Sequence, residues 1–121
     1  MDFQNSSVFK LKQAADYADK VSELLLPGEE ILDAYKSMRD GVVLTTKRII
    51  VVNVQGLTGK KKDYTSIPYS KIQAYSVETA GAFDLDSELE VYISSIGQLR
   101  FEFATNSKVV EISKYISQGI L

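Results

Sequence analysis

Residues 66–93, S-I-P-Y-S-K-I-Q-A-Y-S-V-E-T-A-G-A-F-D-L-D-S-E-L-E-V-Y-I, decide the fold of this chain. Two strand-patterned runs flank an insert of small, aromatic and acidic residues. In the second run, residues 88–93, apolar and polar positions alternate, which indicates a strand with one buried face. The insert between the runs is predicted to be a long shaped connection in which Phe83 and Leu85 require cover.

Outside this stretch, short β-patterned runs follow one another at roughly ten-residue spacing, with turn signals between them. Asp40-Gly41 is a residue pair typical of a tight hairpin. This arrangement predicts a meandering sandwich or barrel of about seven strands. The predicted strands are residues 30–38, 42–46, 47–54, 63–66, 70–79, 88–93 and 99–103.

The run R-I-I-V-V-N-V, residues 48–54, is apolar at both odd and even positions. A strand with this pattern is buried on both faces rather than on one. Its outer face therefore needs a cover. We expect either the N-terminal helix or another copy of the protein to supply it.

Both ends of the chain carry helical patterns. Residues 7–26 have apolar side chains at spacings of three or four, and Pro27-Gly28 is a strong stop signal. Residues 107–118 show the same periodicity, and Gly119 suits the end of a helix. We therefore predict an N-terminal amphipathic helix, a set of strands and a C-terminal helix, within one compact unit.

The composition removes several classes of function. The chain has 121 residues, 45% apolar and 25% charged, which is ordinary globular usage. It contains no Cys and no His, so the usual Cys/His zinc sites, thiol chemistry and imidazole bases are excluded. The net charge of −2 argues against bulk attraction to nucleic acid, although a local basic patch could still act.

No run approaches the ~20 apolar residues that cross a bilayer. The N-terminus lacks the basic segment followed by an apolar core that marks a signal peptide. A cytoplasmic location is the expectation that follows.

Several words of the sequence resemble the bacterial pleckstrin-homology (PH) domain family. They occur in order from residue 24 to the C-terminus, which makes an accidental likeness improbable. They are L-L-P-G-E-E-I-L from Leu25, L-T-T-K-R-I-I-V-V from Leu44, Q-G-L-T-G-K-K from Gln55, S-I-P-Y from Ser66 and V-E-T-A-G-A-F-D-L-D-S-E-L from Val77.

This resemblance implies an α+β protein: a PH-like, partly open antiparallel β-barrel with a C-terminal helix that caps one end. The PH-like domain would span residues 27–121, after an N-terminal helical segment at residues 1–26. Members of the family that the chain resembles are small bacterial proteins of unassigned activity. The resemblance therefore implies a ring-shaped homo-oligomer, formed through strand and hairpin contacts, with a binding or scaffolding role. It provides no catalytic residues to transfer.

Lys60, Lys61 and Lys62 are a candidate anion or lipid site, because three adjacent ammonium groups could meet a phosphate-rich headgroup. The alternative is a solvated hairpin tip. Neighbouring side chains in a strand point to opposite faces, so adjacent lysines splay apart rather than converge.

A group of acidic residues at positions 78–90 suggests a calcium site, since hard cations bind clustered oxygen ligands. The spacing lacks the turn glycine and the closing Glu of an EF-hand loop. Glu88 and Glu90 could instead meet Arg100 across a hairpin. We expect no metal site, no cofactor and no enzymatic activity.

Self-association is the function that the residues favour. Ile49 and Val51 of the two-sided run, together with Ala82, Phe83 and Leu85 of the insert, are the candidate contacts. The leading hypothesis is a non-enzymatic interaction or scaffolding module that builds a homo-oligomeric ring and presents a surface to a protein or peptide. The alternative is a peripheral binder of membrane headgroups or other anions that uses the three lysines.

Overall fold

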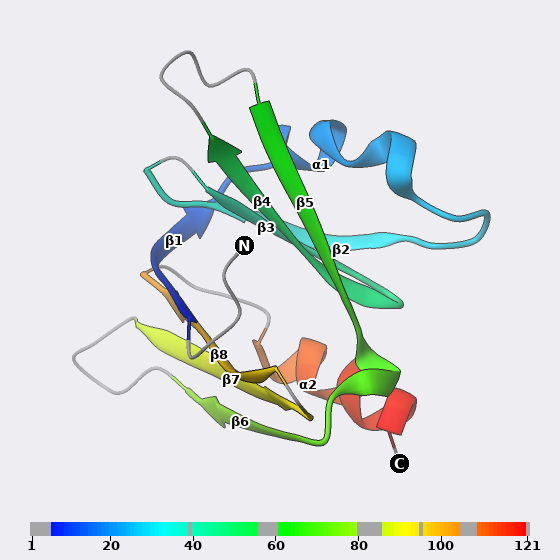
Figure 1. Ribbon diagram of the computed structural model, residues 1–121, viewed down its shortest axis with the longest axis vertical. Helices are drawn as coiled ribbons and strands as arrows, with labels where there is room; N and C mark the ends of the chain where they lie inside the picture. Colours follow the sequence, from blue (N-terminus) through cyan, green and yellow to red (C-terminus); the bar gives the residue numbers. More distant parts are fainter. Residues whose placement is uncertain are drawn as a thin grey trace.

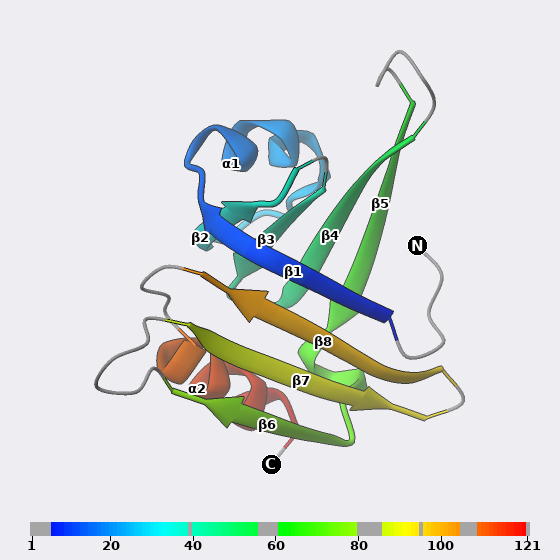
Figure 2. The ribbon, with the colours of Figure 1, turned by 90° about the vertical axis from the view of Figure 1, so that its left-hand side faces the viewer.

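The structure is a computed structural model that describes residues 6–38, 40–55, 61–79, 86–94, 96–104 and 109–120. Its strands form one open eight-stranded sheet in the order β5-β4-β3-β2-β1-β8-β7-β6 (Figures 1 and 2). The strands are β1 Ser6–Gln13, β2 Ile31–Lys36, β3 Gly41–Thr45, β4 Arg48–Gln55, β5 Lys61–Pro68, β6 Ala74–Glu78, β7 Ser87–Ile93 and β8 Gly97–Phe103.

Two antiparallel meanders, β2 to β5 and β6 to β8, make up most of the sheet. Strand β1 joins them, antiparallel to β2 and parallel to β8. The predicted α+β class is confirmed: an open sheet of antiparallel meanders with a C-terminal helix, α2 Val109–Ile120. The sheet has eight strands rather than about seven because β1 is part of it.

The predicted helix over residues 7–26 is wrong in its first half. Residues up to Gln13 form β1, and only the short helix α1 Asp16–Lys20 and the 3-10 turn η1 Ser22–Leu24 follow. β1 pairs with β8 between Ser6 and Leu11 and with β2 at Lys12 and Gln13. Tertiary pairing of this kind overrides a local helical pattern. The first described part of the N-terminal segment, up to Gln13, thus belongs to the sheet, and α1 and η1 follow it.

Two hydrophobic clusters lie on opposite faces of the strands β2 to β4. The larger cluster lies between the two meanders, where α2 packs against the second meander and the short 3-10 turn η2 Tyr69–Lys71 (Figure 1). The smaller cluster lies under α1. Its buried members are Ala14, Tyr17, Val21, Ala34, Val43, Ile50 and Val52.

Strand β4 is buried on both faces, as its sequence predicts. Ile49 and Val51 belong to the larger cluster and Ile50 and Val52 to the smaller one, and all four side chains are 0% exposed. Burying each of them stabilises the fold by about 2 kcal/mol. The cover on the outer face comes from the N-terminal segment of the same chain.

Helix α1 lies close to the start of β3. A Cβ atom at Gly41 would lie 2.1 Å from Cε1 of Tyr17, so only glycine leaves room for this ring. The Lys20 ammonium sits 4.2 Å from the centre of the same ring. Tyr17 therefore fixes α1 to the sheet.

Three of the quoted sequence words meet at Glu29. In the turn of residues 26–29, Gly28 has a φ of 82° and the Glu29 N–H donates to the Leu26 carbonyl, the arrangement of a type II turn. The Glu29 carboxylate then accepts hydrogen bonds from the Thr45 hydroxyl at 2.6 Å and from Arg48. The Tyr69 hydroxyl donates to the Thr45 carbonyl at 2.6 Å. P-G-E, T-x-x-R and P-Y thus form one buried polar network, whose role is to join the loop before β2 to β3, β4 and η2.

Candidate functional site

The two ends of the sheet are the most prominent interaction feature of the described chain. Strands β5 and β6 are its terminal strands, and within the described ranges no strand pairs with the outer edge of either. The backbone N–H and C=O groups along such an edge can pair with another chain. Pro68 ends β5, which fits an edge position because proline has no N–H to donate.

The residues predicted for self-association are not brought together at these edges. Ile49 and Val51 lie in the core of a single chain at 0% exposure, so their side chains cannot line a contact surface. They are buried because β4 has strands on both sides and side-chain cover on both faces. Ala82, Phe83 and Leu85 lie outside the described residues, and self-association itself stays a prediction.

The predicted lysine triplet is only partly described. Lys60 lies outside the described residues, whereas Lys61 and Lys62 open β5 with exposed side chains. Successive residues of a strand point to opposite faces, so these two ammonium groups do not converge. Anion binding at this site stays a prediction.

The outer face of β7 and β8 carries an ion-pair ladder. Arg100 donates from Nε to Glu88 Oε2 at 3.1 Å and from Nη2 to Glu88 Oε1, and its Nε lies 3.8 Å from Glu90 Oε1. The hydrogen bond with Glu88 raises the pKa of the Arg100 guanidinium above its ordinary value. The predicted pairing of these carboxylates with Arg100 is confirmed.

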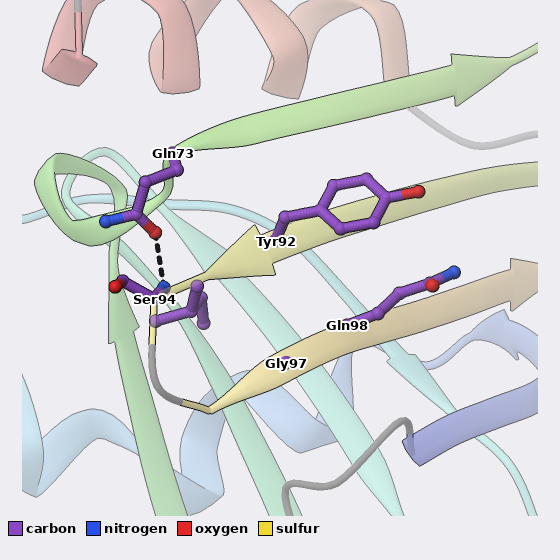
Figure 3. Close-up of a pocket in the computed structure, with 6 residues that line it drawn as sticks. Gln73, Tyr92, Ser94, Gly97 and Gln98 are labelled. Carbon is purple, nitrogen blue, oxygen red and sulfur yellow. Dashed lines mark hydrogen bonds between the residues drawn. The ribbon is translucent and has the colours of Figure 1, made fainter.

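A shallow hollow of about 460 Å³ lies at the turn between β7 and β8 (Figure 3). The Gln73 side chain closes one side by accepting a hydrogen bond from the Ser94 N–H. Tyr92 is 37% exposed and points along β7, beside Gln98 on β8. Its hydroxyl donates to Glu90 at 3.0 Å, and this bond raises the pKa of the phenol. The lining combines one aromatic ring with two amide side chains.

Sequence reasoning missed a second hollow, of about 280 Å³, between β1 and the β2–β3 hairpin. Its lining, called the basic hollow below, consists of Lys10, Lys12, Lys36, Ser37 and Met38. The helical interpretation of residues 7–26 hid it, because a helix would place Lys10 and Lys12 apart. The alternation K-L-K over residues 10–12 was the available signal, since alternate residues of a strand share a face.

Among the residues that the structure describes, no three Asp or Glu side chains are grouped so that they could hold a metal ion.

None of the helices described here has the length and apolar character needed to cross a bilayer.

The sequence matches a family model over nearly all of its length. The model describes the bacterial PH domain, and it matches residues 2–120. The uncharacterized proteins YjqA and YozO of Bacillus subtilis (strain 168) are also similar. YjqA is 43% identical over 101 residues, which cover 82% of this chain and 81% of YjqA. YozO is 31% identical over 113 residues, which cover 93% and 96%.

Solved structures show the same architecture. A protein with a pleckstrin-homology domain from Shewanella loihica PV-4 superposes with a TM-score of 0.73 at 36% identity, over 94% of this chain and all of that one. The pleckstrin-homology domain from Shewanella amazonensis SB2B gives 0.59 at 44% identity, with coverage of 88% and 87%. A PH-domain-containing protein of Exiguobacterium sibiricum 255-15 gives 0.60 at 22% identity, with coverage of 91% and 62%, and this likeness concerns the fold alone.

Proposed function

This chain belongs to the bacterial PH-domain family, and from that premise we propose that it is a non-enzymatic interaction module that assembles with copies of itself into a ring. The observation that carries the proposal is the open sheet, in which no described strand pairs with the outer edge of β5 or of β6. Fold alone does not establish function, so the proposal rests on these edges.

The two edges match each other in the orientation of their side chains. Asp63, Thr65 and Ile67 of β5 lie on the face of the larger cluster, because β5 pairs with β4 in that register. Tyr75 and Val77 of β6 pack on the same cluster. The face of the sheet that carries the larger cluster can therefore continue from β5 of one copy to β6 of the next.

Charge selects one antiparallel register between these edges. With Asp63 opposite Val77, Lys62 of one copy lies opposite Glu78 of the other on the outer face. Both side chains are exposed in the single chain. An opposite-charge pair at this position favours this register, which pairs all five residues of β6.

Pairing of β5 with β6 joins two different surfaces, so the contact is heterologous. Contacts of this kind produce a ring when the rotation between subunits closes and a filament when it does not. A ring uses the outer edges of β5 and β6, whereas the residues that line the hollow at the β7–β8 turn belong to neither strand. We propose that this hollow receives a protein or peptide, since an exposed Tyr and adaptable amides suit peptide contacts.

The first test is size-exclusion chromatography with light scattering over a dilution series. We expect a mass several times that of the 13.5 kDa chain, maintained at micromolar concentration. A monomer at that concentration overturns the proposal.

The second test reverses the charges at the proposed contact. Glu78→Lys and Lys62→Glu should each weaken the assembly, because each places like charges opposite one another, and the double variant should restore it. Lys114→Glu on the exposed side of α2 is the control and should leave the mass unchanged. If the assembly persists in both single variants, the register is wrong while self-association stands.

A further inference from the structure

Strand β1 joins the two meanders through a short and irregular set of backbone pairs. Its described register with β2 consists of two pairs, Lys12 with Lys36 and Gln13 with Tyr35. Its pairing with β8 is parallel, and parallel pairing is slightly less stable per residue than antiparallel pairing. In Figure 2, β1 crosses the front of the view with β8 below it, at the seam between the meanders.

The backbone of β1 is also strained. Its register against β8 shifts between Val8 and Leu11, and Lys10 adopts a φ of 56°. Non-glycine residues rarely adopt this left-handed conformation, and holding one in it costs stability. Strain at Lys10 therefore weakens the pairing of β1 with β8.

The charges on β1 oppose its pairing with β2. Lys12 lies directly opposite Lys36, and like charges at opposite positions of a sheet destabilise it. Lys10 lines the same basic hollow. None of these three ammonium groups makes an ion pair with a carboxylate in the described part of the chain. An acidic residue in the position of Lys12 would instead form an opposite-charge pair with Lys36.

The core connects β2 and β8 without the help of β1. The rings of Tyr35 on β2 and Phe103 on β8 meet edge-on, with 4.7 Å between their centres. Leu11 of β1 lies opposite Phe103 and is 0% exposed in the same cluster. When β1 leaves, the contact between the two rings still holds the neighbouring strands together. The site left behind, called the β1 seat below, consists of the facing edges of β2 and β8, the space filled by Leu11, and Lys36.

We propose that the β1 seat binds an extended acidic peptide segment of a partner protein, which takes the place of β1. The segment puts an aliphatic side chain in the Leu11 position and a carboxylate opposite Lys36. Main-chain hydrogen bonds to the strand edges give such a contact its affinity, and alternate side chains give it specificity. Strand β1 is thus the chain's own occupant of a peptide site. The seat does not depend on the proposed ring, which uses the edges of β5 and β6.

The first test uses a labelled peptide of residues 6–13 that carries Lys10→Glu and Lys12→Glu. Fluorescence anisotropy should show that it binds about tenfold more tightly than the unaltered peptide, because repulsion by Lys36 becomes attraction. A scrambled peptide of the same composition should not bind. The proposal is overturned if the acidic peptide does not bind at millimolar concentration, or if either of the other peptides binds equally well.

Hydrogen exchange, followed by mass spectrometry, distinguishes displacement of β1 from docking on the surface lysines. With saturating acidic peptide, the amides of β1 should exchange at least tenfold faster, because the displaced strand is open to water. The amides of β4 should keep their rates and serve as the internal control. Unchanged or slower exchange in β1 shows that the peptide lies on an intact sheet, and this result overturns displacement.

A charge reversal on β1 tests the same exchange from the other side. Lys12→Glu gives β1 a favourable pair with Lys36, so in the free protein its amides should exchange more slowly. The acidic peptide should then bind about tenfold more weakly, because β1 competes better for the seat. Lys114→Glu, on the exposed side of α2, changes the net charge equally and should alter neither measurement. Equal effects of the two variants, or unchanged exchange of β1 in Lys12→Glu, overturn the proposal.

Discussion

Arg48 donates two hydrogen bonds to the Glu29 carboxylate, from Nε to Oε2 at 2.9 Å and from Nη2 to Oε1 at 3.0 Å. The Glu29 side chain is 0% exposed and that of Arg48 is 19% exposed. Nη2 also donates to the Leu24 carbonyl at 2.6 Å. One guanidinium thus joins the start of β4 to the N-terminal segment and to the turn before β2.

The Glu29 network should make the protein sensitive to acid. Burial alone would raise the pKa of Glu29, but hydrogen bonds from Arg48, Thr45 and the Leu26 N–H outweigh it and lower the pKa from 4.5 to about 2. A depressed carboxyl pKa contributes stability that is present above about pH 4.5 and lost as the pH falls toward 2, up to about 3 kcal/mol. Urea unfolding at pH 7 and pH 3 should show this loss, and Glu29→Gln should reduce it. An unchanged pH dependence in the variant would contradict the prediction.

The two arginines of the ion pairs should differ in their contribution to stability. Arg48→Gln leaves a buried carboxylate without its partner, which costs about 3 kcal/mol of unfolding free energy. Arg100 is 37% exposed, so Arg100→Gln should cost less than about 1 kcal/mol. Denaturant unfolding of both variants in the same buffer measures the difference. Equal costs would show that burial does not decide the strength of these pairs.

Gly41→Ala should destabilise the protein by about 1–3 kcal/mol, because the new methyl group occupies the position of the Tyr17 ring. Thermal unfolding measures the cost. Tyr17→Ala removes the ring and provides the control: in that background Gly41→Ala should cost little. A cost that persists without Tyr17 would place the conflict in the backbone instead.

Tyr69 should resist ionisation in the folded state. Burial raises the pKa of its phenol well above the ordinary value of 10.0, with further contributions from Glu29 and Tyr115. Because the folded pKa is raised, the stability it provides is present below about pH 10 and falls as the pH rises further. Ultraviolet titration should show a tyrosine ionisation step that appears only on unfolding, and Tyr69→Phe should make that step smaller by one tyrosine. Titration of Tyr69 with the exposed tyrosines would refute its burial.

Alternation along the chain was sufficient to predict the β7–β8 hairpin. Leu89, Val91 and Phe101 alternate with polar residues, and each is buried where the pattern places it. The two-sided burial of β4 was equally readable, because an apolar run of this length has no polar face to turn outward. The residue pattern of a strand shows which of its faces are buried when each face has the same kind of neighbour along its whole length.

The N-terminal segment shows where this reasoning fails. Leu11 of β1 is buried in the larger cluster, whereas Ala14 and Val21, on either side of α1, are buried in the smaller one. A spacing of three or four thus arises from a strand and a short helix that bury their apolar residues on opposite faces of the sheet. Local periodicity does not record which distant strands flank a segment. The basic hollow was missed for the same reason, since Lys36 meets Lys12 only through the β1–β2 pairing.

Strand β5 extends beyond its predicted residues 63–66 because β4 offers a partner along all of Lys61–Pro68. The sequence words around Glu29 were recognisable, yet their hydrogen bonds were not, because each word holds only part of the network. Side-chain networks between distant segments depend on the assembled fold.

The parallel pairing of β1 with β8 has a consequence for the order of folding. Ser6 of β1 lies opposite Leu99 of β8. β1 is synthesised before β8, so it cannot pair with β8 until most of the chain has been made, and only then do the two meanders become a single sheet. Contacts between such distant segments form slowly, because a long loop must close before they gain any stabilisation. Until β1 pairs, the edges of β2 and β8 that it will occupy stay open. During this period β1 of one copy can pair with β2 or β8 of another copy. The joint that unites the sheet is thus also the point at which neighbouring chains are most exposed to mispairing during synthesis.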